Sequence, residues 1–277
     1  MENNLGANDY NKVSPLSVSY CENVFLGKWK SAYHNVFEIY YLVDGTCNFF
    51  VDDKIYTLYP GDMLLIPPWV FHRAIYDEKN PVTRYVVSCD TANILPKTRE
   101  LLGSIGYYIE RIPRSLGDAE KIFLKIWKEY SAPHLLSGEL ISGYITELAA
   151  LIHLAEKSRK STDVSSDNSV IELAVAYLKN NYANDISVDD VSRHVSVSKA
   201  HLSRIFKAET GFGIKEYLTL YRIKQAEFML SESSASPISE IAYDCGFNDS
   251  NYFASLFKKT VGVTPTEFRK NISTKQD

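Results

Sequence analysis

The sequence predicts a two-domain α+β protein. We expect an N-terminal antiparallel β-barrel domain that also carries helices, and a C-terminal all-α domain with two tandem helix-turn-helix units. Three observations lead to this prediction: short apolar runs between turn residues in the first ninety positions, a polar segment at 157–169, and an internal repeat in the last ninety residues. A chain of 277 residues has room for two domains, which we place at 1–156 and 170–277.

The N-terminal strands are predicted from alternating, β-branched and aromatic runs between about residues 18 and 90. The runs 36–43 and 47–51 are separated by Asp44-Gly45, a dipeptide typical of a hairpin turn. Further turns and one more apolar run follow at Asp52-Asp53, 59–62, 63–66 and Pro67-Pro68. Short strands with such regular turns are typical of a small barrel or jelly roll.

Two amphipathic helices are predicted after the barrel, because apolar residues recur with the spacing i, i+3, i+4, i+7. The first helix has its apolar positions at Ala119, Ile122, Phe123, Ile126, Trp127 and Tyr130. The second has them at Ile141, Tyr144, Ile145, Leu148, Leu151, Ile152 and Ala155. This second stripe is broader than packing on one barrel requires. The helices therefore either cover the barrel alone or also pair two subunits.

Residues 157–169 separate the two predicted domains. The segment is rich in Ser, Lys and Asp and lacks the apolar content that packing requires, so we interpret it as a linker.

The C-terminal repeat consists of two copies of one apolar pattern. At an offset of 50 residues, Val191, Val195 and Val197 match Ile241, Cys245 and Phe247. At an offset of 51, Leu202, Ile205, Phe206, Lys207 and Gly211 match Phe253, Leu256, Phe257, Lys258 and Gly262. Each copy predicts a short helix, a tight turn and a second helix, which we call the reading helix. In the second copy, Ala242 permits a close helix crossing and Gly246 permits positive φ at the turn.

Helix starts in this domain are marked by capping residues. Capping boxes are predicted at Ser187 with Asp190 and at Thr264 with Glu267. At Ser236-Pro237, a cap residue is predicted before a proline at the first helical position. Between the copies, residues 214–230 predict one long helix with its core side at Tyr217, Leu218, Tyr221, Ala226 and Met229. At about 1.5 Å per residue, this helix is long enough to hold the two units about one DNA turn apart.

The charge of the chain limits what it can bind. A formal net charge of −4 and a pI near 5.9 are not typical of a general nucleic-acid binder. Basic residues are concentrated locally, since residues 193–208 contain Arg193, Lys199, Arg204 and Lys207 without an acid. Residues 250–266 contain only Lys258 and Lys259 as charged groups. Such patches supply affinity for phosphate, whereas the near-neutral background limits indiscriminate binding.

The cysteines and the hydropathy pattern predict the compartment. Cys21, Cys47, Cys89 and Cys245 are scattered without a CxxC pair, which is typical of reduced thiols. The sequence has no secretory signal and no apolar span of twenty residues. We therefore expect a cytoplasmic protein without a membrane partner.

The C-terminal pattern resembles the AraC/XylS family of transcriptional regulators over roughly residues 169–269. The resemblance rests on 201–207, Thr210-Gly211, Ile241-Ala242, Gly246-Phe247, Tyr252-Phe253, 257–259, Gly262, Thr264-Pro265 and Phe268-Arg269. It implies that the reading helices contact promoter half-sites on double-stranded DNA, that RNA polymerase is a partner, and that the chain forms a homodimer through its two N-terminal helices. The implied DNA-binding residues are Lys199, Ala200, Ser203, Arg204, Lys207, Ser250, Asn251, Tyr252, Ser255 and Lys258.

Three positions depart from the family pattern. Ser192 stands where the family usually has alanine, and Ser196 where a glycine or another turn-tolerant residue is common. Ser255 matches Arg204, at a position where a basic residue is frequent. We therefore expect Arg204 to make the strongest single base contact, and Lys258 to contact phosphate. The second unit would then contribute more through Ser250, Asn251 and Tyr252.

The N-terminal domain resembles cupin barrels, which are common sensors ahead of such a DNA-binding domain. The patterns His34-x₃-Glu38-x₆-Gly45 and Gly61-x₅-Pro67-x₄-His72 look like the two cupin motifs. Ala32 replaces the first motif histidine, and Trp69 replaces the glycine between Pro67 and His72. The remaining His34, Glu38 and His72 would either hold a divalent metal with open positions or line a ligand pocket. We expect the pocket, with neither a metal nor another cofactor.

The strand period identifies which groups share the barrel interior. Glu38 and Tyr40 lie on one face of their strand, and Phe37, Ile39 and Tyr41 on the other. Aromatic, charged and hydrogen-bonding groups together suit a polyhydroxylated ligand, so the expected effector is a sugar. The expected effector-binding residues are His34, Glu38, Tyr40, Trp69, His72 and Arg73.

Both resemblances together imply a sequence-specific transcriptional regulator, not an enzyme, whose activity is set by a small effector. Three alternatives remain open. One is a regulator of virulence or stress genes that senses a non-sugar ligand such as a fatty acid, which an oily pocket would favour. Another is a metal-dependent cupin enzyme fused to a DNA-binding domain, which a stoichiometric metal would favour. The third is a constitutive DNA-bending protein without an effector.

Overall fold

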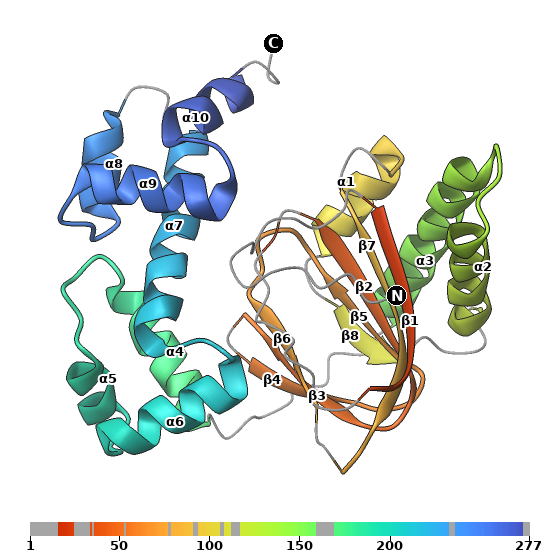
Figure 1. Ribbon diagram of the computed structural model, residues 1–277, viewed down its shortest axis with the longest axis horizontal. Coiled ribbons are helices and arrows are strands. Elements are labelled where there is room, and N and C mark those ends of the chain that lie inside the picture. Colours follow the sequence, from red (N-terminus) through yellow and green to blue (C-terminus); the bar gives the residue numbers. More distant parts are fainter. Residues whose placement is uncertain are drawn as a thin grey trace. The chain divides into compact units, whose positions relative to one another are not determined.

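The structure is a computed structural model of the chain (Figure 1). It describes residues 16–24, 34, 36–52, 54–76, 79–90, 94–105, 108–111, 117–158, 169–232 and 236–273. The described residues up to Ser158 form one compact unit, and those from Ser169 on form a second. Within these ranges, no helix combines the length and the apolar character that crossing a bilayer requires.

The N-terminal unit is built around two antiparallel sheets (Figure 1). The five-stranded sheet has the order β1-β7-β2-β5-β8, and the three-stranded sheet has the order β4-β3-β6. The strands are β1 (Leu16–Val24), β2 (Phe37–Asp44), β3 (Cys47–Val51), β4 (Lys54–Leu58), β5 (Asp62–Ile66), β6 (His72–Ile75), β7 (Val82–Cys89) and β8 (Tyr108–Arg111).

The two sheets enclose an apolar interior, which confirms the predicted antiparallel barrel. One core joins residues of both sheets, with Tyr40 and Leu42 of β2 packed near Phe49 and Val51 of β3. Because successive side chains of a strand alternate between faces, the neighbours Ile39 and Tyr41 belong to a different core.

The turn at Asp44-Gly45 corrects one prediction. It does not close a hairpin, because β2 pairs with β5 and β7 whereas β3 pairs with β4 and β6. The chain instead passes from one sheet to the other here, with Gly45 at a φ of 86°. A Cβ atom at Gly45 would lie 2.4 Å from the carbonyl oxygen of Pro81, so glycine is required for this close approach. The apolar pattern marks a turn but does not specify which strands pair.

The other predicted turns are present. The hairpin between β3 and β4 turns directly after Val51, which pairs with Lys54, and Asp52 has a φ of 56°. Asp53 lies outside the described residues. The turn at 59–62 is closed by the Asp62 N–H, which donates to the carbonyl of Tyr59 at 2.9 Å.

Helices cover the outer face of the five-stranded sheet (Figure 1). They are α1 (Pro96–Ile105), α2 (Ala119–Ser131) and α3 (Ser137–Ser158). Their apolar stripes pack on the outward residues of β2, and the ring of Phe123 stacks on Tyr41 at 5.2 Å. The two predicted helices are confirmed, whereas α1 and β8 were not expected. Only Thr98 and Leu102 of α1 are buried, which is too sparse a pattern to recognise.

All secondary-structure elements among the described residues of the C-terminal unit are helices, connected by turns (Figure 1). Its helices are α4 (Val170–Asn181), α5 (Val188–His194), α6 (Lys199–Thr210), α7 (Ile214–Glu232), α8 (Ile238–Asp244), α9 (Ser250–Val261) and α10 (Pro265–Ser273). Helices α5 and α6 form the first helix-turn-helix unit, α8 and α9 form the second, and α7 is the predicted long helix between them. The expected linker is narrower than 157–169, because α3 continues through Ser158 and Ser169 caps α4.

The helix caps follow the predictions with one exception. Ser187 and Asp190 form a capping box at α5, and Thr264 and Glu267 exchange the same reciprocal hydrogen bonds at α10. At α8, however, Pro237 occupies the N-cap position and makes no side-chain cap, since the helix begins only at Ile238. Ser236 therefore precedes the cap, because the proline has an extended ψ of 143° and is not yet helical.

Candidate functional site

The first reading helix, α6, presents a basic and polar outer face. Its N-cap is Ser198, whose side chain accepts from the His201 N–H. Leu202 and Phe206 are fully buried and anchor the helix in the core. Because these residues share one side of the helix, the predicted contact residues lie on the other. All five are exposed: Lys199, Ala200, Ser203, Arg204 and Lys207.

The second reading helix, α9, repeats this arrangement with other outward residues. Phe253 and Phe257 are fully buried, at positions that correspond to Leu202 and Phe206. Tyr252 is 58% exposed, and its ring lies 6.4 Å from Phe247 at the preceding turn. Of the predicted contact residues, Ser250 is half-buried, and the exposed ones are Asn251, Tyr252, Ser255 and Lys258.

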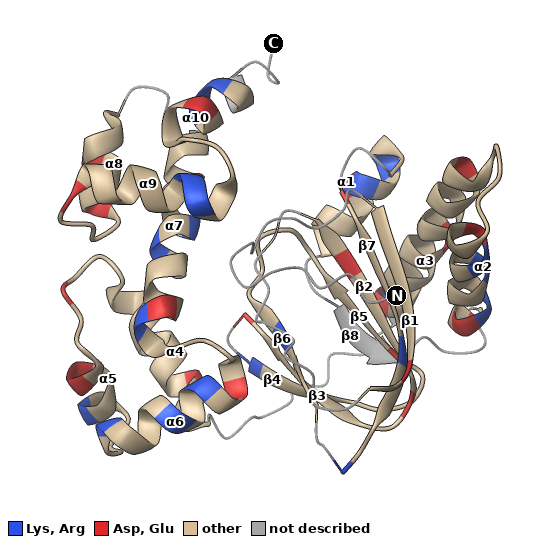
Figure 2. Cartoon of the chain, viewed as in Figure 1, with Lys and Arg blue, Asp and Glu red and all other residues tan. Residues whose placement is uncertain are grey.

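Acids on α5 lie close to two basic residues of the first unit. Lys199 Nζ lies 2.8 Å from Asp189 Oδ2, and Arg193 pairs with Asp190. Figure 2 shows these opposite charges together at α5 and α6. Residues 193–208 contain no acid, but the fold places Asp189 and Asp190, in the first turn of α5, beside basic residues of this stretch. Arg204 makes a different contact, with a guanidinium nitrogen 3.2 Å from His201 Nδ1. Its charge is therefore not neutralised by this contact.

A second candidate site is a cavity of about 300 Å³ inside the N-terminal unit. Its wall is formed by Ser17, Ser19, Glu38, Tyr40, Phe49, His72, Arg73, Ala74, Tyr76, Arg84, Val86 and Ser88. This volume lies at the lower end of the range of about 300–1,000 Å³ that is common for small-molecule sites.

The register of three neighbouring strands places the polar wall residues in rows. Ser17 of β1, Ser88 of β7 and Glu38 of β2 lie opposite one another. The next inward row contains Ser19, Val86 and Tyr40, and the one after it contains Cys21, Arg84 and Leu42. The wall of the cavity therefore changes from hydroxyl and carboxylate groups at one end to a guanidinium at the other.

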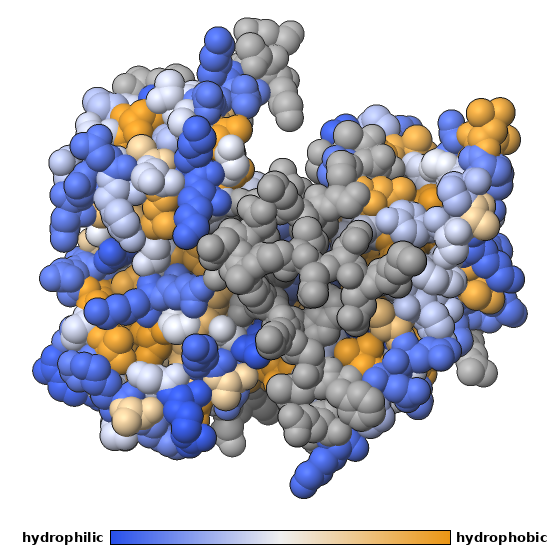
Figure 3. All heavy atoms as spheres, in the orientation of Figure 1, coloured by the Kyte–Doolittle hydropathy of each residue, from blue (hydrophilic) through white to orange (hydrophobic). Residues whose placement is uncertain are grey.

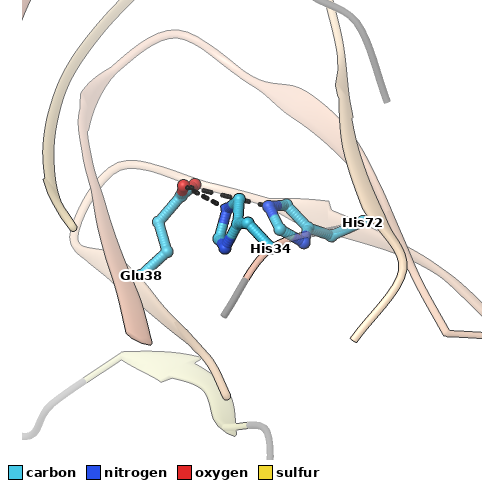
Figure 4. A group of neighbouring side chains, drawn as sticks. All are labelled: His34, Glu38 and His72. Atoms are coloured by element: carbon cyan, nitrogen blue, oxygen red, sulfur yellow. Dashed lines mark ion pairs between the residues drawn. The ribbon is translucent and has the colours of Figure 1, made fainter. Parts of the chain in front are cut away.

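Glu38 directs its carboxylate toward two neighbouring buried histidines, His34 and His72 (Figure 4). Its Oε2 is 3.4 Å from His34 Nε2 and 3.8 Å from His72 Nε2. Burial raises the pKa of the Glu38 carboxyl, but hydrogen bonds and charge from both histidines outweigh burial and hold the pKa well below its usual range. Glu38 is therefore ionised at neutral pH.

The geometry of His72 decides what this cluster can hold. His72 Nδ1 lies 2.8 Å from the carbonyl oxygen of Val70, so Nδ1 carries the proton. With Nδ1 protonated, Nε2 faces Glu38: it donates to the carboxylate when His72 is protonated, and a neutral His72 offers the lone pair of Nε2, as a metal-ligating histidine does. The ligand atoms of His34, Glu38 and His72 lie within 4.8 Å of one another, so these residues fit a divalent metal with open positions. Protonated His72 would instead form an ion pair with Glu38.

Arg84 and two tyrosines form the other end of the cavity, which the sequence did not reveal. The Arg84 side chain is buried at 3% exposure, and its guanidinium carbon lies 5.6 Å from the ring centre of Tyr40 and 6.0 Å from that of Tyr76. Burial raises the pKa of Tyr40 well above its usual value and that of Tyr76 to about 12. Strand alternation from Ser88 through Val86 was the signal that could have identified Arg84.

The six predicted effector residues are only partly brought together. Glu38, Tyr40, His72 and Arg73 reach the cavity wall, and His34 contacts it through Glu38. Trp69 is not among the wall residues, although its backbone N–H donates to the backbone carbonyl of His34 at 2.8 Å. Trp69 has a φ of 62°, so the backbone keeps the conformation that glycine adopts easily.

Comparisons with known proteins cover both units of the chain. A protein-family model described as a helix-turn-helix domain matches residues 191–271, and a second family model, described as an AraC-like ligand-binding domain, matches residues 29–158. A helix-turn-helix-type transcriptional regulator in the cgkA 5′ region of Pseudoalteromonas carrageenovora is 40% identical over 117 residues, which cover 42% of this chain and 69% of that protein. The transcriptional activator RhaS of Escherichia coli is 33% identical over 120 residues, or 43% of each chain. The chain thus matches less than half the length of RhaS.

One of the solved structures that this chain matches is ToxT from Vibrio cholerae. It is 15% identical with a TM-score of 0.38, and the alignment covers 92% of this chain and 97% of ToxT. The C-terminal domain of AraT, a response regulator from Geobacillus stearothermophilus, is 31% identical with a TM-score of 0.36. That alignment covers 38% of this chain and 88% of the AraT domain.

Proposed function

Because this chain belongs to the AraC family of transcriptional regulators, we propose that its N-terminal cavity binds a sugar-type effector that controls DNA binding by the C-terminal unit. Regulators of this kind bind DNA through the helix-turn-helix domain and a small molecule through the ligand-binding domain, and the chain is a regulator rather than an enzyme. The observation that carries the sugar proposal is the composition of the cavity wall.

The wall offers what a polyhydroxylated ligand requires. Three serines, Glu38 and His72 provide directed hydrogen-bonding groups, which fit ring hydroxyls. The rings of Tyr40, Phe49 and Tyr76 provide an apolar surface for the face of a sugar. A fatty acid would instead favour an oily wall. The serines, Glu38 and His72 of this wall therefore support the sugar over the non-sugar alternative.

In the proposed mechanism, the effector changes which promoter half-sites a homodimer occupies. A ligand shifts such a balance only through its different affinity for the two states. The connection between α2 and α3 exposes Leu135 at 93% and Leu136 at 55%, and an apolar area is visible at the tip of this helical hairpin in Figure 3. These side chains support a contact between subunits, which we place at α2 and α3. The dimer would act in the cytoplasm and contact RNA polymerase at the promoter.

Thermal unfolding of the full chain tests the effector proposal. A ligand at a hundredfold excess over its Kd stabilises the folded state by about 2.7 kcal/mol, so a panel of mono- and oligosaccharides should contain members that raise the melting temperature. Glu38→Gln should reduce that shift, whereas Glu100→Gln on the exposed surface of α1 should preserve it. The absence of any saccharide response would contradict the proposal and favour a non-sugar effector.

A divalent metal that assists effector binding is the second candidate. The His72 tautomer favours it, since Nε2 can face a cation together with His34 and Glu38. A metal bound there would present a positive charge to ligand hydroxyls. Repeating the saccharide screen after chelation separates the two candidates. A shift that survives chelation would support a metal-free pocket, and a shift that is lost would support the metal.

A further inference from the structure

We propose that the effector carries an anionic group, which Arg84 binds at the end of the cavity opposite Glu38. This inference rests on the proposed function and narrows it from a sugar to a sugar acid or a sugar ester of sulfate or phosphate. Its basis is the position of a buried guanidinium in the wall of the same cavity.

The charges of the wall are arranged as two separate ends. Glu38 provides a carboxylate at one end of the wall, and the imidazoles of His34 and His72 lie beside it. Arg84 lies on β7, two inward rows from the row that contains Ser88 and Glu38. Four residues of β-strand separate the Cα atoms of Arg84 and Ser88 by about 13 Å. A ligand that fills the cavity would therefore meet the carboxylate with one end and the guanidinium with the other.

The guanidinium of Arg84 lies against the rings of Tyr40 and Tyr76. Their rings contact the guanidinium by cation–π interactions at 5.6 and 6.0 Å, which stabilise a cation without neutralising it. Ring contacts involve the faces of a guanidinium, whereas its N–H donors point outward in its plane. That planar fork matches the two oxygens of a carboxylate, sulfate or phosphate.

Arg73 plays a different part from Arg84. Arg73 also lines the cavity, but it is half-buried and follows His72 on β6, whereas Arg84 is buried at 3% exposure. Arg84 shares the inward face of β7 with Val86 and Ser88, which are also wall residues. The proposal therefore assigns the anion to Arg84, and Arg73→Met serves as a test of that assignment.

Size and polarity limit the rest of the ligand. A cavity of about 300 Å³ accommodates a molecule of monosaccharide size rather than a polymer. Ser17 and Ser88 lie in the row of Glu38, and Ser19 lies one row closer to Arg84, so ring hydroxyls would lie at this part of the cavity. The predicted ligand class is therefore an acidic monosaccharide, with its anionic group at Arg84 and hydroxyls at the serines and Glu38.

The test compares matched probes on the full chain. The neutral probes are glucose and galactose, and the acidic ones are glucuronate, galacturonate, glucose 6-phosphate and galactose 6-sulfate. Binding is measured by calorimetry and by the shift in melting temperature, at an ionic strength matched with sodium chloride. We expect at least one acidic probe to bind at least about tenfold more tightly than its neutral parent, since charge-assisted hydrogen bonds are the stronger ones. The carboxylate, phosphate and sulfate probes identify the anionic group.

Variants test the role of Arg84. Arg84→Met should weaken the acidic probe at least about tenfold and leave the neutral parent within twofold. Arg84→Lys, which keeps a charge in the buried site, should fall between these values and provides a second variant if Arg84→Met does not fold. Arg99→Met, on the exposed surface of α1, is the matched control and should bind as the unaltered chain does.

The outcomes separate the two proposals. Equal or tighter binding of the neutral parents, or equal losses of both ligand types in Arg84→Met, would overturn the anionic effector and leave the sugar effector in place. Loss through Arg73→Met alone would overturn the assignment to Arg84. If no probe of either class binds, the sugar effector fails and the anionic inference fails with it.

Discussion

The two helix-turn-helix units share one internal framework and differ in what they present outward. Each reading helix is anchored by a fully buried phenylalanine, Phe206 in α6 and Phe257 in α9. Each also ends at a left-handed glycine, Gly211 with a φ of 82° and Gly262 with a φ of 91°. The repeat in the sequence is therefore a repeat of packing and capping residues.

The turns inside the units reach the same backbone conformation with different residues. Ser196 has a φ of 57° in the first unit, and Gly246 has a φ of 82° in the second. A Cβ atom at Gly246 would lie 2.8 Å from the carbonyl oxygen of Tyr182 and 2.9 Å from that of Ala183. The second turn therefore requires glycine for space as well as for φ. Arg222 of α7 reinforces this junction by donating to the Tyr182 carbonyl at 2.7 Å.

The outward faces show the largest difference. Arg204 is exposed on α6, whereas the matching position on α9 is Ser255. Tyr252 is exposed on α9 instead. The comparison teaches that the framework is common to both units while each outward face is separate. We therefore expect the first unit to depend on charge and the second on hydroxyl, amide and aromatic contacts.

The largest effect that we expect concerns the two turns. Gly246→Ala should lower the free energy of unfolding by about 2–4 kcal/mol, because it adds both an unfavourable φ and a close contact with backbone. Ser196→Gly should change stability by less than about 1 kcal/mol, since it relieves φ at the cost of chain entropy. Urea denaturation of the full chain measures both. Similar losses in the two variants would refute the distinction between the turns.

The next effect concerns base reading. Arg204→Ala should cost about 1–3 kcal/mol of DNA affinity, concentrated at one base pair, if Arg204 contacts guanine. Ser255→Ala, at the matching position of the second unit, should cost less than that. Fluorescence anisotropy on a duplex selected by the full chain from random DNA, and on single-base variants of it, measures both.

Lys258→Ala serves as the control for base reading. It should weaken all sequences alike and flatten the salt dependence, as expected of a phosphate contact. An equal loss for Arg204→Ala on every sequence would make Arg204 a phosphate contact as well.

The smallest effect concerns the ion pair between Asp189 and Lys199. The residue that matches Asp189 in the second unit is Ser239, so Asp189→Ser makes the first unit resemble the second at this position. Freeing Lys199 should raise affinity for non-specific duplex about twofold and steepen its salt dependence. Asp244→Ser, which removes an exposed acid from α8, controls for the change in net charge. If both variants gain affinity equally, the effect belongs to net charge and not to the ion pair.

The predicted features that depend on neighbours in the sequence are confirmed, except the cap at Ser236-Pro237. The capping boxes at Ser187 and Thr264, the long helix α7 and the helices α2 and α3 follow from residues within a few turns of one another. That Glu38 and Tyr40 share one face of β2 also followed from the strand period, and the structure places both at the cavity.

Features that depend on distant segments required the tertiary structure. The sequence by itself determined the two helix-turn-helix units, the barrel strands other than β8 and the face of β2 that Glu38 and Tyr40 share, because periodicity and capping are local. Only the fold decided that Asp44-Gly45 joins two sheets, that Arg84 reaches the cavity and that Asp189 lies beside Lys199. Strand pairing and side-chain convergence depend on which segments meet in space, and an alternating pattern fixes the face of a strand without fixing its partner.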